Sequence, residues 1–213
     1  MNAYTKLESK NNSNLILRVV PGHFVTPNAH TNYYMEMTQI LRRQSEAKAV
    51  AKAMSEYYTN STIVDTILCL DGMDVIGAYL ADELTRAGIL STNAHKTMYI
   101  ISPEFDSSGQ MFFRENMETW IRNKNILILL PTASTGSSIT KAAQTVLYYG
   151  GKVSGVSAIF SAVNSIDGYP VFSLFKTSDL PDYHVYKHKD CPLCKAGVKV
   201  DAIVSGKGYS RIR

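Results

Sequence analysis

A short buried strand followed by an amphipathic helix is the clearest pattern in the chain. Residues 126–130 are consecutive aliphatic side chains, typical of a strand covered on both faces, and such strands belong to parallel sheets. After a polar turn, apolar side chains recur with helical spacing at Ile139, Ala142, Ala143, Val146 and Leu147. Gly150 and Gly151 then supply residues suited to end a helix. The pattern predicts strand, tight turn and helix over residues 125–149.

The same order of elements recurs earlier in the chain. Residues 63–70 predict a second buried strand, followed by a polar loop at 71–74 and a helix over about residues 75–87 that Gly88 closes. Further strands are predicted at residues 97–101 and 153–162, and a long helix at residues 36–58. Strands that alternate with helices favour an α/β fold with an open parallel sheet flanked by helices, whose ligand site lies beyond the carboxyl ends of the strands.

Two polar loops at that edge carry candidate ligand-binding groups. The loop at 131–138 holds five hydroxyl groups at a predicted helix N-terminus, where unpaired backbone N–H groups and the helix dipole favour a phosphate. Many such turns serve only to cap their helix, so both interpretations stay open here. Asp71 and Asp74 in the other loop are equally open between helix capping and contact with a ligand or metal.

Composition narrows the class of protein. A chain of 213 residues and 23.6 kDa with 45% hydrophobic residues can bury the core of one domain with a small appendage. The chain has no long apolar run, no signal pattern at the N-terminus and only three cysteines. These features predict a cytoplasmic protein without a membrane partner. The net charge of +4 comes entirely from residues 176–213, with 8 Lys and Arg against 4 Asp and Glu. Such a modest basic tail is typical of a solvated surface and argues against nucleic-acid binding.

The basic tail contains a candidate metal site. Cys191 and Cys194 have the C-x₂-C spacing of a zinc knuckle, and His184 and His188 precede them. These four side chains predict a zinc site. Free thiols, or a redox-active pair beside ordinary surface histidines, are the competing interpretation.

Three segments match one known family in sequence and order. They are GHFVTPNAHTNYY at 22–34, LDGMDVIG at 70–77 and ILILLPTASTGSSI at 126–139. They resemble the type I phosphoribosyltransferases, and among them the orotate phosphoribosyltransferases, over about residues 15–165. The resemblance implies an N-terminal segment with a small hood at residues 1–35, a phosphoribosyltransferase-like core at 36–175, and the basic cysteine-containing tail at 176–213.

The resemblance also implies site residues. The family's loop for the 5-phosphate of phosphoribosyl pyrophosphate (PRPP) corresponds to Thr132, Ala133, Ser134, Thr135, Gly136, Ser137 and Ser138. Its pyrophosphate loop corresponds to Asp71, Gly72, Met73 and Asp74. The hood that would meet the base corresponds to Phe24, His30 and Tyr33. A homodimer and a magnesium ion that accompanies PRPP are further expectations from the family.

The chain differs from the family at positions that would bind the ribose, the magnesium ion and the pyrophosphate. Leu130 and Pro131 stand where two acidic residues would bind the ribose hydroxyls and help to hold Mg²⁺. Neither side chain accepts a hydrogen bond, and each such bond to a carboxylate is worth about 1.5–3 kcal/mol. The segment SPEFDSSGQ at 102–110 also lacks the Arg and Lys residues that orotate enzymes carry in their mobile loop. Magnesium binding is therefore doubtful, and no catalytic residue is assigned.

Two functional hypotheses follow. In the first, the chain is an orotate phosphoribosyltransferase-like protein that binds PRPP or a nucleoside monophosphate and transfers phosphoribose to a nitrogenous base. In the second, it kept the fold and lost catalysis, and it acts as a nucleotide or PRPP sensor or as an interaction protein.

Overall fold

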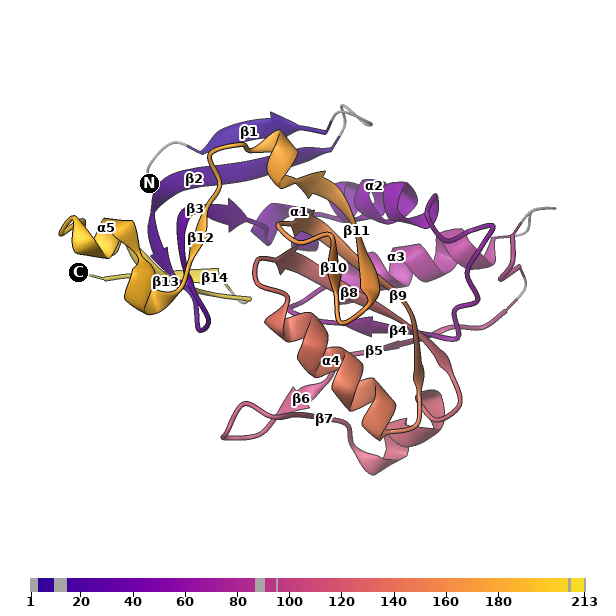
Figure 1. The fold of residues 1–213 in the computed structure, drawn as a ribbon. Coiled ribbons are helices and arrows are strands. Elements are labelled where there is room, and N and C mark those ends of the chain that lie inside the picture. The colour runs from indigo at the N-terminus through magenta and orange to yellow at the C-terminus, as the bar shows by residue number, and fades with distance from the viewer. Residues whose placement is uncertain (1–3, 10–14, 87–90, 95, 207, 213) are drawn as a thin grey trace.

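The computed structural model describes residues 4–9, 15–86, 91–94, 96–206 and 208–212. They form two six-stranded sheets, a core sheet and a hood sheet, and a separate two-stranded hairpin (Figure 1). The core sheet has the order β10-β11-β9-β8-β4-β5. Its members are β4 (Thr66–Cys69), β5 (Tyr99–Ile101), β8 (Asn125–Ala133), β9 (Lys152–Ser161), β10 (Ser165–Ile166) and β11 (Tyr169–Lys176). All pair in parallel except β10, which forms an antiparallel hairpin with β11. The predicted α/β fold with a parallel sheet is confirmed.

Helices cover both faces of the core sheet. Alternate residues of β8 point to opposite sides: Leu127 and Leu129 pack with α2 (Gln44–Ser55) and α3 (Asp74–Thr85), whereas Ile126 and Ile128 pack with α4 (Ser137–Tyr148). This double burial explains the unbroken aliphatic run in the sequence. A short 3₁₀ helix, η1 (Glu115–Trp120), and a hairpin of β6 (Glu104–Phe105) and β7 (Met111–Phe112) lead into β8.

The predicted helices differ from the observed ones mainly at their ends. The single helix expected at 36–58 is two helices, α1 (Thr38–Arg42) and α2, because Arg43 between them has extended backbone angles (φ −81°, ψ 116°). The end of the helix predicted at 75–87 and its closing Gly88 lie outside the described residues. Gly150 follows α4 with a φ of 77°, the left-handed conformation predicted for it.

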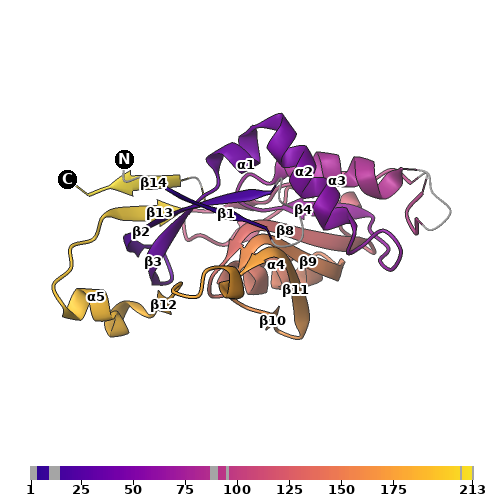
Figure 2. The same ribbon diagram turned by 90° about the horizontal axis from the view of Figure 1, so that it is seen from above.

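The hood sheet joins both ends of the chain (Figure 2). Its order is β12-β3-β2-β13-β14, and β1 pairs with β2. Its members are β1 (Thr5–Glu8), β2 (Ile16–Val25), β3 (His30–Glu36), β12 (Val185–Tyr186), β13 (Ala202–Ser205) and β14 (Gly208–Arg211). Three short helices lie between β11 and β13: η2 (Thr177–Asp179), η3 (His188–Asp190) and α5 (Pro192–Lys195). The structure thus unites the predicted hood and the predicted tail in one sheet.

An ion pair connects the hood sheet to the core. Arg18 on β2 donates two hydrogen bonds, 3.0 and 3.2 Å long, to the two carboxylate oxygens of Glu46 on α2. The Arg18 side chain is 9% exposed, and a paired, partly desolvated guanidinium is costly to separate from its partner.

None of the helices in the described part of the chain is long and apolar enough to cross a membrane.

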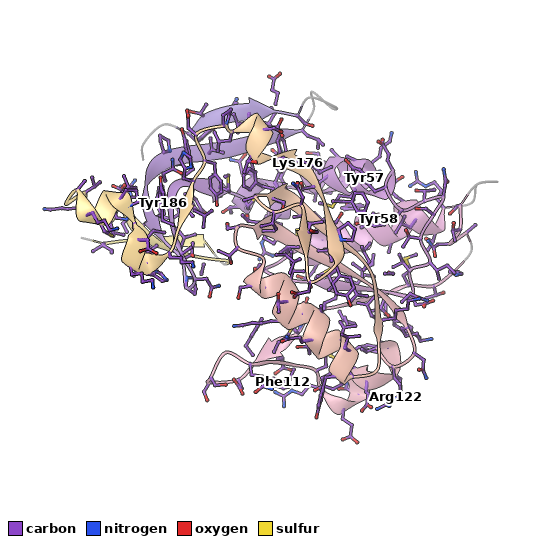
Figure 3. The ribbon with its side chains drawn as sticks, viewed as in Figure 1. Tyr57, Tyr58, Phe112, Arg122, Lys176 and Tyr186 are labelled. Atoms are coloured by element: carbon purple, nitrogen blue, oxygen red, sulfur yellow. The ribbon has the colours of Figure 1, made fainter. Side chains whose placement is uncertain are left out.

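Two tyrosines at the end of α2 provide a test of the packing (Figure 3). The buried Tyr58 hydroxyl bonds to the Val156 carbonyl (3.2 Å) and the Ser157 hydroxyl (3.0 Å) on β9. We expect Tyr58→Phe to lower the free energy of unfolding by about 1–2 kcal/mol, because Ser157 then loses a buried partner. Tyr57→Phe is the matched control, since Tyr57 is exposed, and should change it by less than about 0.5 kcal/mol. Urea unfolding measures both, and equal effects would contradict this description of the packing.

Candidate functional site

The carboxyl ends of β4 and β8 bring the two predicted ligand loops to one edge of the sheet. The strands pair in parallel with Cys69 opposite Leu129, so the loops that follow them are neighbours. The loop after β8 ends at Gly136, whose φ of 80° is left-handed, and α4 begins at the next residue. A Cβ atom at this position would collide with the side chain of Ile166, so both backbone and packing require glycine.

The hydroxyl groups of this loop differ in exposure and partners. Thr135 is exposed and its Oγ1 accepts a 3.4 Å hydrogen bond from the Ser137 N–H, while Thr132, Ser137 and Ser138 are half-buried. The half-buried Ser134 shares a 2.9 Å hydrogen bond with the Tyr183 hydroxyl. The loop therefore offers hydroxyl groups beside the first turn of α4, whose N–H groups have no acceptor within their own helix.

A carboxylate that the sequence analysis did not single out lies beside the same helix. Asp167, in the turn between β10 and β11, accepts a 2.6 Å hydrogen bond from the Thr140 hydroxyl in the first half of α4. Asp167 and Gly168 both have left-handed backbone angles, as a tight hairpin turn requires. An Asp-Gly pair is the signal that could have predicted this turn, although not its position against α4.

The two residues that replace the family's acidic pair are part of the strand. Leu130 is 1% exposed and packs on the α4 side of the sheet, and Pro131 is also buried. The pairing of β8 with β9 continues past them, with Thr132 opposite Phe160. Because a hydrocarbon side chain and a proline ring offer no oxygen atom, positions 130 and 131 do not fit a magnesium ion.

The predicted pyrophosphate loop makes a sharp turn between β4 and α3. Asp71 and Gly72 have φ angles of 51° and 86°, Met73 is fully buried, and the Asp74 carboxylate accepts a hydrogen bond from the Ser102 hydroxyl. Asp74 is thus engaged by the segment after β5, on the side away from β8. The Asp71 carboxylate lies against Gly206 in the turn between β13 and β14.

The structure adds a cation to this loop. A Cβ atom at Gly72 would lie 3.5 Å from Nη2 of Arg42, the last residue of α1. Arg42 is exposed, and no motif in the sequence marks it, because its position depends on how α1 packs beside the loop. A guanidinium here would suit an anionic group bound at the loop.

The three predicted hood residues do not converge on one place. Phe24 packs against Tyr34, with ring centroids 5.9 Å apart, and both line a cavity of about 360 Å³ on the hood sheet. Tyr33 packs instead on the core, because successive residues of a strand face opposite sides. Burial raises the pKa of Tyr34 to about 12, so its hydroxyl stays protonated at neutral pH. His30 belongs to the group described next.

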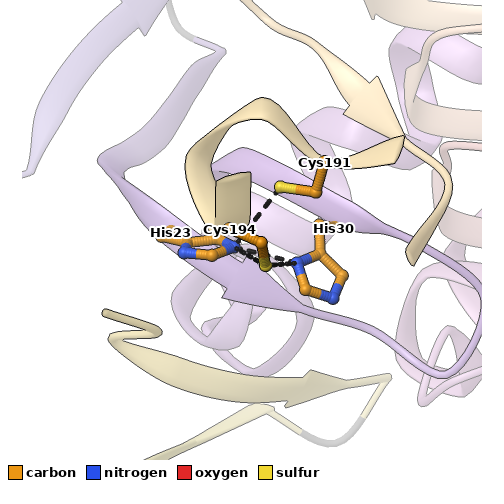
Figure 4. A group of neighbouring side chains, drawn as sticks. All are labelled: His23, His30, Cys191 and Cys194. Carbon is orange, nitrogen blue, oxygen red and sulfur yellow. Dashed lines mark hydrogen bonds between the residues drawn. The ribbon is translucent and has the colours of Figure 1, made fainter. Parts of the chain in front are cut away.

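The cysteine pair of the tail meets a different pair of histidines from the predicted one (Figure 4). Cys191 and Cys194 group with His23 on β2 and His30 on β3. The expectation that His184 and His188 complete the set is corrected, because neither belongs to this group: the ring of His184 lies beside that of Tyr186 (centroids 5.9 Å apart), and the ring of His188 packs against that of His30. Spacing along the chain suggested the local histidines, whereas strand pairing supplies the distant ones.

Comparison with known proteins identifies the fold and the relatives. No family model matches the sequence. An orotate phosphoribosyltransferase from Wolinella succinogenes is 27% identical over 195 residues, covering 85% of this chain and 88% of that protein. Two solved structures are similar in fold. The orotate phosphoribosyltransferase from Aeropyrum pernix has a TM-score of 0.54 and 17% identity, with 76% of this chain and 90% of that one covered. The adenine phosphoribosyltransferase from Thermoanaerobacter pseudethanolicus has a TM-score of 0.51 and 13% identity, with 81% and 95% covered.

The close packing at Gly136 gives a prediction about the loop. Gly136→Ala should lower the free energy of unfolding by more than about 2 kcal/mol, because alanine would face both a left-handed backbone and the Ile166 side chain. Gly168→Ala is the control: its φ is 83°, but nothing lies within 4 Å of the added Cβ, so only the backbone cost of about 1 kcal/mol remains. Chemical denaturation compares them, and a smaller effect at Gly136 would contradict the observed packing.

Proposed function

Because the chain resembles the orotate phosphoribosyltransferases in sequence and has the type I phosphoribosyltransferase fold, we propose that it binds a phosphorylated ribose compound, either PRPP or a nucleoside monophosphate. The 5-phosphate would occupy the loop at 132–138. The supporting observation is the left-handed Gly136 at the start of α4, which sets hydroxyl-bearing residues of the loop beside the N–H groups of the first helical turn. The helix dipole favours an anion at this end.

The ribose contacts of this proposal do not use a carboxylate pair. Leu130 and Pro131 are buried within the pairing of β8 with β9, and their side chains hold no oxygen atom. The acceptors that the resemblance implies for the ribose hydroxyls are therefore missing at these positions. Binding therefore depends on the phosphate, and we assign it no magnesium ion at 130–131. This favours a binding or sensing role in which the fold is kept without rapid transfer.

Transfer of phosphoribose to a nitrogenous base is the second candidate. Arg42 beside Gly72 favours it, because a cation at the pyrophosphate loop would stabilise the negative charge that develops on the leaving group. The names of the relatives point the same way. The buried Leu130 and Pro131 count against transfer.

We also propose, from the family resemblance, that the chain acts as a cytoplasmic homodimer.

Calorimetric titration distinguishes the two candidates. We expect PRPP or a nucleoside monophosphate to bind with an affinity that magnesium changes by less than about twofold, since Leu130 and Pro131 offer no carboxylate to hold the ion. Tightening of PRPP binding by about tenfold or more with magnesium would contradict this expectation. Release of pyrophosphate from PRPP that requires orotate or adenine and is matched by formation of the nucleoside monophosphate would establish transfer in place of binding alone.

Two threonine-to-valine variants, one in the loop at 132–138 and one in α4, test whether this loop binds the ligand. Thr135→Val removes an exposed hydroxyl in the loop and should weaken ligand binding by about tenfold, the typical loss for one hydrogen bond to a charged group. Thr145→Val, near the other end of α4, removes a hydroxyl that bonds to the Lys141 carbonyl and should leave the affinity unchanged. Equal affinities for Thr135→Val and the unmodified protein would remove the loop from the binding site.

A further inference from the structure

We propose that His23, His30, Cys191 and Cys194 bind one zinc ion, which fastens the C-terminal segment to the hood. The ligand atoms are His23 Nε2, His30 Nδ1 and the two Sγ atoms, and the four side chains can bring them within 4.8 Å of one another. Two thiolates and two imidazoles are a ligand set that zinc prefers in structural sites.

The distances between these atoms fit a tetrahedral ion. The observed sulfur-to-nitrogen distances are 3.5 Å for Cys191 to His23, 3.6 Å for Cys194 to His23 and 3.4 Å for Cys194 to His30. Zinc bonds of about 2.3 Å to sulfur and 2.05 Å to nitrogen at tetrahedral angles give a separation of about 3.5 Å. The two nitrogen atoms lie 2.8 Å apart. They would need to separate to about 3.3 Å, a shift that small rotations of the rings can supply.

The orientation of His23 supports ligation. Its Nδ1 lies 2.9 Å from the Val198 carbonyl oxygen, which can only accept a hydrogen bond, so Nδ1 carries the proton. The lone pair of Nε2 then points into the group of four. A ligating histidine that donates its other N–H to a backbone carbonyl is the usual arrangement in zinc sites.

Local structure prepares both halves of the site. Cys191 and Cys194 bracket the start of α5, where the Lys195 N–H donates to the Cys191 carbonyl and Gly197 turns the chain with a φ of 71°. On the hood side, the tight turn between β2 and β3 is closed by the Thr26 N–H and the Ala29 carbonyl, 2.8 Å apart. Figure 4 shows the two cysteines of the tail beside His23 and His30 of the hood strands.

Burial indicates a closed, structural ion. His23 and Cys191 are each 1% exposed and His30 is 8% exposed, whereas Cys194 lies at the surface. Four protein ligands leave no open coordination position for a substrate, so the ion would hold structure instead of performing chemistry. The site stands independently of the proposed ligand loop.

The ion would connect parts of the chain that are far apart in sequence. His23 and Cys191 are separated by 168 positions. From the site the chain runs into β13, whose Ala202 pairs with Phe24, and on to the β13–β14 turn, where Gly206 lies against Asp71. Fixing Cys191 and Cys194 to the hood would thus also fix the segment that covers the loop at 71–74.

The zinc content of the full chain tests the proposal. The protein is purified without chelator, exposed to zinc and desalted before the metal is measured. We expect about one equivalent of zinc in the unmodified protein and below about a tenth of an equivalent in Cys194→Ser, whose exposed side chain makes it the ligand least risky to replace. His184→Gln is the matched control, because it removes a histidine of the same segment that is outside the group of four, and it should keep about one equivalent. Loss of zinc from His184→Gln as complete as from Cys194→Ser would overturn the ligand set.

A second measurement needs no variant. The unmodified protein loaded with Co²⁺ should show the strong visible absorption bands of a tetrahedral thiolate site, and zinc should abolish them by displacement. Bound zinc should also protect Cys194, the exposed cysteine of the pair, from alkylation until a chelator is added, as followed by mass spectrometry. The competing description is a metal-free group in which the two imidazoles and the thiols bond only to each other. It predicts no cobalt bands and no protection by zinc, and that result would overturn the proposal.

Discussion

Burial of β8 on both of its faces is the constraint on which the rest of the core depends. A central parallel strand can be covered only if helices lie on each side, and α2 with α3 on one face and α4 on the other meet that demand. The same strand fixes the edge at which the ligand loops lie, because β4 pairs with it in register. It also carries buried hydrocarbon side chains at Leu130 and Pro131, the positions where the family resemblance predicts acidic groups. The same strand therefore holds the core together and lacks carboxylate side chains at positions 130 and 131.

The hood depends on contacts between the ends of the chain. β13 adds in parallel to β2, and the His23 N–H donates to the Asp201 carboxylate across 178 positions of sequence. The group of two histidines and two cysteines lies at this junction, and the turn after β13 reaches Asp71 at the edge of the core. The C-terminal segment therefore contacts both the hood strands and the loop at 71–74.

Local pattern was enough to predict the α/β class, the strand–turn–helix unit at 125–149 and the left-handed Gly150, because these depend on periodicity and turn chemistry. The split between α1 and α2 was missed because one extended residue, Arg43, does not interrupt a helical pattern. The cysteine pair was visible from its spacing, but His23 and His30 were not recognised as its partners, because strand pairing brings them there. Arg42 and Asp167 were missed for the same reason: their positions at the site arise from packing between distant elements.

The proposed function depends on binding of a phosphate at the start of α4. Nuclear magnetic resonance of the ¹⁵N-labelled chain during titration with ribose 5-phosphate tests it most directly, because each backbone amide reports separately. We expect the amide signals of Thr135, Gly136, Ser137 and Ser138 to shift together, since their N–H groups would meet the anion at the helix N-terminus. Shifts confined to the cavity beside Phe24 and Tyr34, or no shifts at all, would contradict it.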